Sequence, residues 1–207
     1  MPKNRKQQFS EALDRLLERK SLDRITVSDI TDECGLNRQT FYYHFHDIYE
    51  LIEWQIDCQV AAIAGNENWL ENFDELLDGL FLGMLDSRRS VMHLYNSRGW
   101  HHIIDYMRRR LSPLLEARAR YIVEKEGMMV DEGDIQFVVQ IHEIAAYGVL
   151  DTWIDAGMPG SHPEDLDRLH RLTRGSLEHA LSNFDRRGEK RDTEARKVHC
   201  ARAREVL

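Results

Sequence analysis

A glycine between two short amphipathic segments is the feature that most restricts the fold of this chain. In the stretch ITVSDITDECGLNRQTFYYHF, residues 25–45, Gly35 can take the left-handed backbone conformation that ends a helix. Thr26 and Asn37 each precede one of the two segments, where an N-cap side chain accepts a hydrogen bond from the next turn. The stretch therefore predicts a helix, a tight turn and a second helix.

The second of these helices carries more polar and aromatic side chains than packing requires. Phe41 and Phe45 lie four residues apart and can anchor it together with Leu36. In a helix-turn-helix, the second helix enters the major groove, where Arg and Gln contact purine edges and Thr meets a thymine methyl. Tyr and His can reach phosphates. We expect this surface to bind double-stranded DNA, with a short core helix as the alternative. The residues on it are Arg38, Gln39, Thr40, Tyr42, Tyr43 and His44.

The remainder of the chain has the apolar spacing of helices. Leu, Glu, Arg and Ala recur at intervals of three and four, and the 207 residues include only 4 prolines. We therefore expect an all-α fold in three parts. A three-helix DNA-binding domain spans residues 1–46, a helical effector-binding and dimerisation domain spans 47–185, and a polar tail, which we expect to be flexible, spans 186–207.

Caps and breaks locate the individual helices. The first is expected from Asn4 to Lys20, and the fourth begins at Asp47 and ends near Gly65. Later helices are expected at 67–86, 88–96, 100–126 and 134–156, with a final apolar stripe from Pro163 to Phe184. Pro113 should break or kink the helix that contains it, because a proline removes one backbone donor.

The charge of the chain is unevenly distributed. The net charge is −8, with 8 Lys and Arg against 9 Asp and Glu in residues 1–52, 12 against 22 in 53–184, and 8 against 5 in 185–207. A nucleic-acid site therefore belongs to the N-terminal part. Its basic edge is formed by Lys3, Arg5, Lys6, Arg15, Arg19 and Lys20, with Arg38 further along. With no signal-peptide pattern and no transmembrane run, we expect a cytoplasmic protein without membrane contact.

Metal binding and catalysis have little support in the residue pattern. His101 and His102 are adjacent and point about 100° apart on a helix, and neither pairs with His93 or His142 at a spacing of four. Asp151 and Asp155 share a helical face without a nucleophile nearby. Cys34, Cys58 and Cys200 suggest neither a disulfide framework nor a zinc site. We expect no catalytic residue, metal or cofactor, and keep a metal-dependent helical enzyme as the weak alternative.

Residues 134–156, DIQFVVQIHEIAAYGVLDTWIDA, are apolar on nearly every side. A helix at the surface of a monomer could not expose such a sequence, so it must be covered on two sides. A two-fold bundle with a second copy, formed through residues 134–184, would cover it; a large intramolecular core is the alternative.

A ligand pocket can be built from the aromatic and polar residues of the C-terminal part, although the same residues can also be core. The candidates for contact with an effector are Tyr95, Trp100, His101, His142 and Trp153, with Tyr106 and Tyr147 as further members.

The stretch ITVSDITDECGLNRQTFYYHFHDIYEL resembles the DNA-binding segment of the TetR family of bacterial transcriptional regulators, over about residues 9–55. The resemblance implies a dimer on a pseudo-palindromic operator, modulated by a small-molecule effector, with repression as the default. It also implies that Thr26 and Ser28 contact the operator, that Arg38, Gln39, Thr40 and Tyr43 face bases, and that Tyr42 and His44 hold phosphates.

Two details refine this resemblance. Many members carry a Lys at the position of Ile48, where it contacts a phosphate, so here affinity is expected to depend more on the N-terminal cations. The string NRQTFYYHFHDIYELIEW also resembles a branch that includes activators of dihydroxyacetone utilisation. In that branch a protein co-regulator can replace the small ligand.

Overall fold

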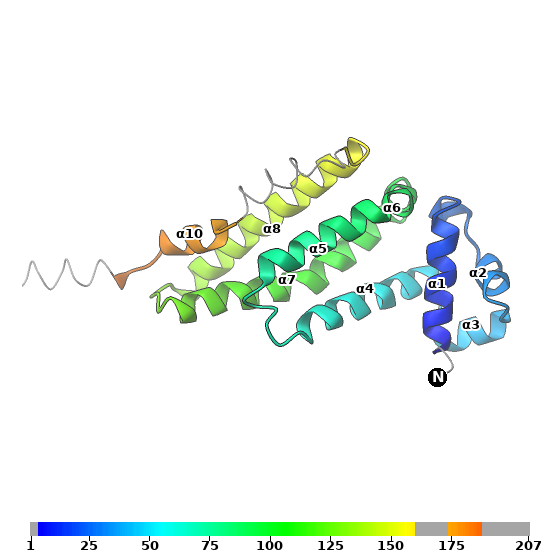
Figure 1. Cartoon of the computed structure of the whole chain (residues 1–207), viewed down its shortest axis with the longest axis horizontal. Coiled ribbons are helices and arrows are strands. Elements are labelled where there is room, and N and C mark those ends of the chain that lie inside the picture. Colours follow the sequence, from blue (N-terminus) through cyan, green and yellow to red (C-terminus); the bar gives the residue numbers. More distant parts are fainter. Residues whose placement is uncertain (1–3, 160–173, 188–207) are drawn as a thin grey trace, which may run out of the picture.

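The computed structural model describes residues 4–159 and 174–187, and within them every regular element is a helix (Figure 1). The all-α expectation is therefore confirmed. The helices run in an elongated arrangement, with the N-terminal helices at one end of the molecule and α10 toward the other (Figure 1). Their bounds are α1 Arg5–Leu17, η1 Leu22–Arg24, α2 Val27–Glu33, α3 Arg38–His44, α4 Ile48–Ala64, α5 Phe73–Asp86, α6 Arg88–Tyr95, α7 Trp100–Lys125, α8 Glu132–Asp155 and α10 Ser176–Ser182.

The N-terminal helices begin where the sequence places polar caps. Asn4, Thr26, Asn37 and Asp47 each accept a hydrogen bond from a backbone amide in the first turn of the helix that follows. Gly35 ends the turn after α2 with φ of 66°, in the region that side chains disfavour. These caps fix the helix, turn and helix that the sequence predicts.

One apolar cluster holds this end of the molecule together. Phe9 and Phe41 are fully buried, and their rings meet edge to face with centroids 5.2 Å apart. Ile30 and Leu51 are also fully buried, so α1, α2, α3 and the start of α4 share one core. Ile48 packs against the same cluster, where an apolar side chain suits the position better than a lysine would.

A second apolar cluster lies where the end of α7, the beginning of α8 and α10 meet. Ala119 and Ile122 of α7, Val138 of α8 and Leu177 and Leu181 of α10 are buried there. Among the described residues, no helix is long and apolar enough to cross a membrane.

Two helix boundaries and the course of one helix through a proline differ from the sequence-based expectation. The helix expected from 67 begins at Phe73, because Asn66 accepts a hydrogen bond from the backbone of Asn68 and a turn forms instead. The first helix ends at Leu17, with its last residues in a turn. Of the break or kink expected at Pro113, the break is absent, because α7 continues through this exposed proline.

The expected helix start at Pro163 and the apolar positions Leu166, Leu169 and Leu172 lie outside the described residues, as do residues 188–207 of the tail. The first two tail residues make contacts. Arg186 forms an ion pair with Asp131 at 2.6 Å, and Arg187 donates to the carbonyl oxygen of Glu126 at 2.7 Å.

Candidate DNA-binding surface and effector region

Helix α3 presents its polar side chains to solvent at one end of the molecule (Figure 1). Phe41 and the C-cap Phe45 are buried, so the opposite side of the helix is directed outward. Tyr43 is 84% exposed and Tyr42 is 58% exposed, and Arg38 and Gln39 are exposed as well. Large aromatic side chains at this exposure contribute little to the fold, which leaves them available to a partner.

An open hollow lies on this outward side. It is lined by Asn37, Gln39, Thr40 and Tyr43. Sequence reasoning gave Asn37 only the role of a cap, because side-chain spacing cannot show that the capping residue borders the exposed face. Asn37 Oδ1 accepts from the backbone amide and the hydroxyl of Thr40, at 2.8 and 2.9 Å. The Thr40 hydroxyl proton is thus occupied, and its methyl group is the part left for a partner.

The Thr26 side chain is committed to a capping box. Its hydroxyl donates to Asp29 Oδ2 at 2.7 Å and accepts from the Asp29 backbone amide at 3.2 Å. The hydrogen bond from Thr26, together with Lys20 at 2.9 Å, lowers the pKa of Asp29 to about 2. A contact from the Thr26 hydroxyl to DNA would have to exchange with this bond, whereas half-buried Ser28 carries no such commitment to Asp29.

Several cations of the expected basic edge are paired within the protein. Arg15 and Arg19 both form ion pairs with Glu33. The hydrogen bond from Arg19 lowers the pKa of the Glu33 carboxyl most, and the hydrogen bond from Arg15 lowers it further. Lys6 lies over the rings of Phe45 and Trp54, 5.1 and 5.9 Å from their centroids. The edge is therefore less free than the sequence suggests, although Arg15 and Arg19 keep about half of their side-chain surface exposed, 50% and 57%.

His44 is half-buried rather than free on the surface. Its ring lies 5.0 Å from that of Tyr43 and 6.4 Å from that of Phe9. This packing gives His44 a fixed position beside the exposed tyrosine.

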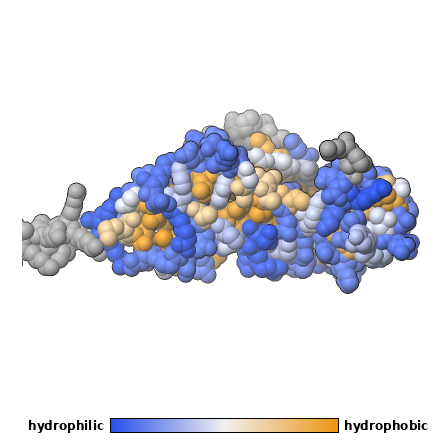
Figure 2. Space-filling view, turned by 90° about the horizontal axis from the view of Figure 1, so that it is seen from below, coloured by the Kyte–Doolittle hydropathy of each residue, from blue (hydrophilic) through white to orange (hydrophobic). Residues whose placement is uncertain are grey.

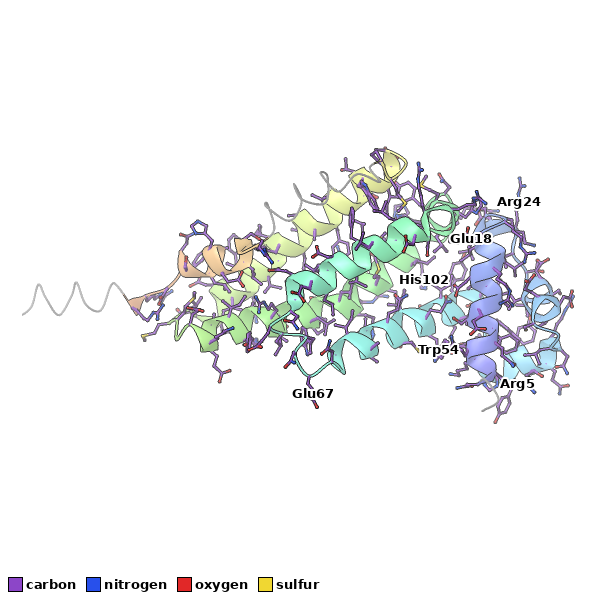
Figure 3. The ribbon with its side chains drawn as sticks, in the orientation of Figure 1. Arg5, Glu18, Arg24, Trp54, Glu67 and His102 are labelled. Carbon is purple, nitrogen blue, oxygen red and sulfur yellow. The ribbon has the colours of Figure 1, made fainter. Side chains whose placement is uncertain are left out.

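A row of polar contacts joins α4 to α7. His102 Nε2 lies 2.8 Å from Glu53 Oε1, and the Tyr106 hydroxyl donates to Asp57 Oδ2 at 3.1 Å. Arg110 Nε donates to the same carboxylate at 2.6 Å. Since the partners recur every four residues on both helices, they form a ladder along the seam. Burial and the bond to Asp57 raise the pKa of Tyr106. Figure 3 shows His102 between the two helices.

A second seam joins α1 and η1 to α6. The Ser90 hydroxyl donates to Glu18 Oε1 at 2.5 Å. Glu18, at the C-terminal end of α1, is labelled in Figure 3. His93 Nδ1 lies 2.5 Å from the carbonyl oxygen of Leu17, so this nitrogen carries the proton and donates it. The Arg98 backbone amide donates to Asp23 at 3.2 Å. The N-terminal helices are thus attached to the C-terminal helices at two places, a link that sequence spacing did not reveal.

Three of the predicted effector residues take part in aromatic contacts, and the other two do not. Tyr95 and Trp100 meet edge to face at 5.2 Å, and the Tyr95 hydroxyl donates to Asp155 Oδ1 at 3.4 Å. Two residues before Asp155, Trp153 stacks on Phe81 with centroids 4.2 Å apart. Burial and the charges of Asp151 and Asp155 raise the pKa of Tyr95.

His101 and His142 do not join this aromatic group. His101 is exposed at the start of α7. His142 directs Nδ1 to the carbonyl oxygen of Val138 at 2.8 Å, one turn back on its own helix. In the described part of the chain, no three His, Cys, Asp or Glu side chains are grouped as metal ligands.

The middle of the C-terminal domain is loosely packed compared with both apolar clusters. Residues 74–96 of α5 and α6, 104–117 of α7 and 140–153 of α8 include half-buried and exposed side chains but none that is buried. The buried residues of α8 lie toward its two ends, at Ile135, Val138, Val139 and Ile154. The side chains of this middle region are thus less shielded from solvent than those of the two clusters.

The outer side of α8 exposes large apolar side chains. Phe137, Ile141 and Ile144 are 53%, 48% and 61% exposed and lie on one side of the helix. Figure 2 shows apolar areas over the middle and near the α10 end of the molecule, whereas the N-terminal end is mostly hydrophilic. The two-sided character expected from the sequence is therefore present, with one side of α8 packed and the other uncovered in a single chain.

Family models match most of the chain. A model described as bacterial regulatory proteins of the TetR family matches residues 11–53, and one described as a transcriptional regulator C-terminal region matches residues 67–175, which is more than half of the chain. No curated protein matches the sequence.

Solved structures share the fold at low sequence identity. The dihydroxyacetone kinase operon activator DhaS is 17% identical, with a TM-score of 0.66 over 87% of this chain and 97% of that one. SmeT, solved with triclosan, is 14% identical, with a TM-score of 0.55 over 88% and 92%. NalD, the secondary repressor of the MexAB-OprM multidrug efflux pump in Pseudomonas aeruginosa, is 14% identical, with a TM-score of 0.50 over 86% and 94%.

These likenesses extend over both the helix-turn-helix end and the C-terminal helices. The two family models, one of which covers more than half of the chain, show that this chain belongs to the TetR family of bacterial transcriptional regulators, which are transcription factors rather than enzymes.

Proposed function

We propose that the protein is a repressor that binds a pseudo-palindromic operator as a homodimer and releases it when an effector enters the C-terminal domain. The exposed outward side of α3 carries this proposal. Arg38, Gln39 and Tyr43 project there from a helix whose other side is fixed by Phe41. Arg and Gln can each make two hydrogen bonds to a purine edge, which is how a helix in the major groove selects a sequence.

The dimer follows from the outer side of α8. An operator with two-fold symmetry requires a two-fold protein, and the exposed Phe137, Ile141 and Ile144 need a cover. Phe184, which packs edge to face on Phe137 at 6.3 Å, extends this surface toward α10. A second copy that presents the same side of α8 would bury both surfaces in one bundle.

Effector control follows from the connection between the two ends of the molecule. The ladder between α4 and α7 and the seam between α1 and α6 transmit any shift of the C-terminal helices to the DNA-binding helices. A ligand can change the DNA affinity only if it binds one arrangement better than the other. The loosely packed middle of α5, α6, α7 and α8 offers such a ligand a place to bind.

Selection of bound DNA from a random pool tests the proposed function directly. We expect one inverted repeat to be enriched, with half-sites about 10 base pairs apart, centre to centre, or a multiple of that spacing. Enrichment of no sequence by the full-length protein would contradict operator binding.

Two variants then test the assignment of α3. Arg38→Ala should lose about 1–3 kcal/mol on the selected repeat and relax the preference at the base pair that it reads. Tyr42→Phe removes only a hydroxyl and should weaken all sequences alike, as a phosphate contact does. Parental binding by both variants across a salt titration would rule out α3 as the recognition helix.

Sedimentation tests the assembly. The full-length protein should be a dimer at micromolar concentration, and Ile144→Arg should yield monomers because it places a charge in the proposed interface. Glu124→Arg, at an exposed position of α7, is the control for an added cation and should remain dimeric. A parental protein that sediments as a monomer would contradict the bundle.

An activator controlled by a protein partner is the second candidate, because DhaS, whose fold is shared over 87% of this chain, is named as an operon activator. A reporter gene placed behind the selected repeat distinguishes the two. Lower expression with the protein than without it supports the repressor, and higher expression supports the activator.

A further inference from the structure

One buried carboxylate oxygen in the middle of α8 has no hydrogen-bond partner. The Oε1 atom of Glu143 is shielded from solvent and accepts no hydrogen bond from any group in residues 4–159 and 174–187. A carboxylate in this position is costly, because desolvation is not offset by a donor. An unpaired acceptor of this kind is a candidate contact for a bound molecule.

Glu143 lies on the inward side of α8, in the loosely packed region. Val139, Leu150 and Ile154 fall on the same side of the helix, and Val139 and Ile154 are buried. The exposed Ile141 and Ile144 lie on the opposite side. The unpaired oxygen therefore belongs to the interior of the domain and not to the surface proposed for the dimer.

The surroundings of Glu143 are acidic and aromatic. Tyr147, one turn along α8, is half-buried, and its burial and the charge of Glu143 raise its pKa to about 12. The positive charge of Arg108, on α7, lowers the pKa of Tyr147 and so opposes these two effects. Asp151, two turns along α8, is exposed and lies about 80° around the helix from Glu143, so Glu143 is the carboxylate of this stretch that faces inward.

Aromatic faces complete this region toward the end of α8. Phe81 and Trp153 are stacked, and Tyr95 contacts both Trp100 and Asp155. Aromatic faces attract cations, and the attraction grows when water is excluded. These rings lie about 15 Å along α8 from Glu143, so Tyr147 is the aromatic side chain within one turn of the unpaired oxygen.

We propose that the effector is an organic cation with an aromatic or alkyl body, whose protonated nitrogen donates a hydrogen bond to Glu143 Oε1. This inference rests on the proposed function, because it names the class of ligand for the same C-terminal domain. The cation supplies a donor to Glu143, and its apolar body lies beside Tyr147, one turn along α8. An anionic ligand would be repelled by the carboxylate of Glu143 and is disfavoured.

Matched probes test the charge requirement. Three arylalkyl ammonium ions of increasing size are compared with the alcohols and carboxylates of the same shape: phenylethylammonium, naphthylmethylammonium and diphenylethylammonium. We expect at least one ammonium ion to raise the thermal midpoint of the full-length protein and to change its tryptophan fluorescence. Its alcohol should bind more weakly and its carboxylate should not bind.

The Glu143→Gln variant provides the second measurement. Loss of the charged acceptor should weaken ammonium binding by about tenfold or more, since a hydrogen bond to a charged group is lost. The same variant should unfold at a higher temperature than the parent when no ligand is present, because an unpaired buried charge is removed. Glu124→Gln, at an exposed position of α7, removes the same charge and should change neither quantity.

The outcomes separate the two proposals. If a repeat is selected and bound but no ammonium ion acts, or if a carboxylate binds as tightly as its ammonium counterpart, the cationic effector is wrong and the operator-binding function stands. Unchanged ammonium binding by Glu143→Gln, or a lower thermal midpoint of the free variant, also overturns the role of Glu143. If no repeat is selected, the proposed function itself fails.

Discussion

The two ends of α4 belong to regions that are packed in opposite ways. Around its beginning, Phe9, Phe41, Ile30 and Leu51 are fully buried in one cluster, which also includes Ile103 at the start of α7. Beyond its end, long stretches of α5, α7 and α8 contain no buried side chain. The first region works by holding a few exposed side chains of α3 in place. The second region, as we propose, works by leaving contacts unfilled until a ligand or a second copy supplies them.

This difference predicts that the two regions contribute unequally to the stability of the molecule. A close-packed core loses several kcal/mol when one large side chain is truncated, whereas a loosely packed region can relax around the change. Local opening should therefore be rarer in α1, α2 and α3 than in α5 and the middle of α8. The predictions below test that contrast.

The largest effect is expected from truncating the core of the DNA-binding end. Phe41→Ala should cost about 3–5 kcal/mol, because Phe41 is fully buried against Phe9. Phe81→Ala, the matched change at a half-buried position of α5, should cost about 1–2 kcal/mol. Hydrogen exchange measured by mass spectrometry locates each loss, in α1 to α3 for the first variant and in α5 and α8 for the second. Equal losses would break the comparison.

An intermediate effect is expected at the junction between the two regions. A Cβ atom added to Gly99 would lie 2.3 Å from the ring of Tyr49, so Gly99→Ala should overpack the seam between α4 and α7 and cost about 1–3 kcal/mol. Gly79→Ala on α5 is the control. No atom lies within 4 Å of its added Cβ, and it should stabilise the protein by about 0.5–1 kcal/mol through higher helix propensity.

Urea unfolding of the parent, of Gly99→Ala, of Tyr49→Leu and of the double variant that combines both changes measures the energetic coupling between these two residues. The double variant should be more stable than the sum of the two single losses predicts. Additive losses would show that the overlap with Tyr49 is not the cause.

The smallest effect concerns the cap of α2. Thr26→Ala should cost about 1 kcal/mol, because the first turn loses its side-chain acceptor. Asp29 has a folded-state pKa of about 2 against 3.8 for the free group, so its contribution to stability is present above pH 4 and is lost as the pH falls toward 2. Asp29→Asn should therefore flatten the pH dependence of the unfolding free energy in that window. An unchanged slope would contradict the capping box as the source of the low pKa.

The sequence predicted the DNA-binding end in detail because its signals are local. Thr26, Gly35, Asn37 and Asp47 act within a few residues of their own positions, and a cap or a left-handed glycine requires no knowledge of the rest of the fold. The apolar spacing of Phe41 and Phe45 likewise identified the side of α3 that faces inward.

The C-terminal site was less predictable because it depends on side chains far apart in the sequence. Tyr95, Trp100 and Trp153 were named as candidates, but their grouping with Phe81 arises from the packing of α5, α6 and α8. Glu143 appeared in the sequence as one carboxylate on an apolar helix. Only its burial without a donor distinguishes it, and spacing cannot show burial.

The length of α4 has a mechanical consequence. With 17 residues it is about 25 Å long, so a tilt of about 5° at its C-terminal end moves its beginning, and with it α3, by about 2 Å. In the proposed dimer the two displacements add to about 4 Å, a third of the roughly 12 Å width of the major groove. A small rearrangement around a ligand is thereby amplified into a mismatch between the two recognition helices and the DNA. A helix one turn shorter would amplify the tilt less, and the regulator would then require a larger rearrangement to release the DNA.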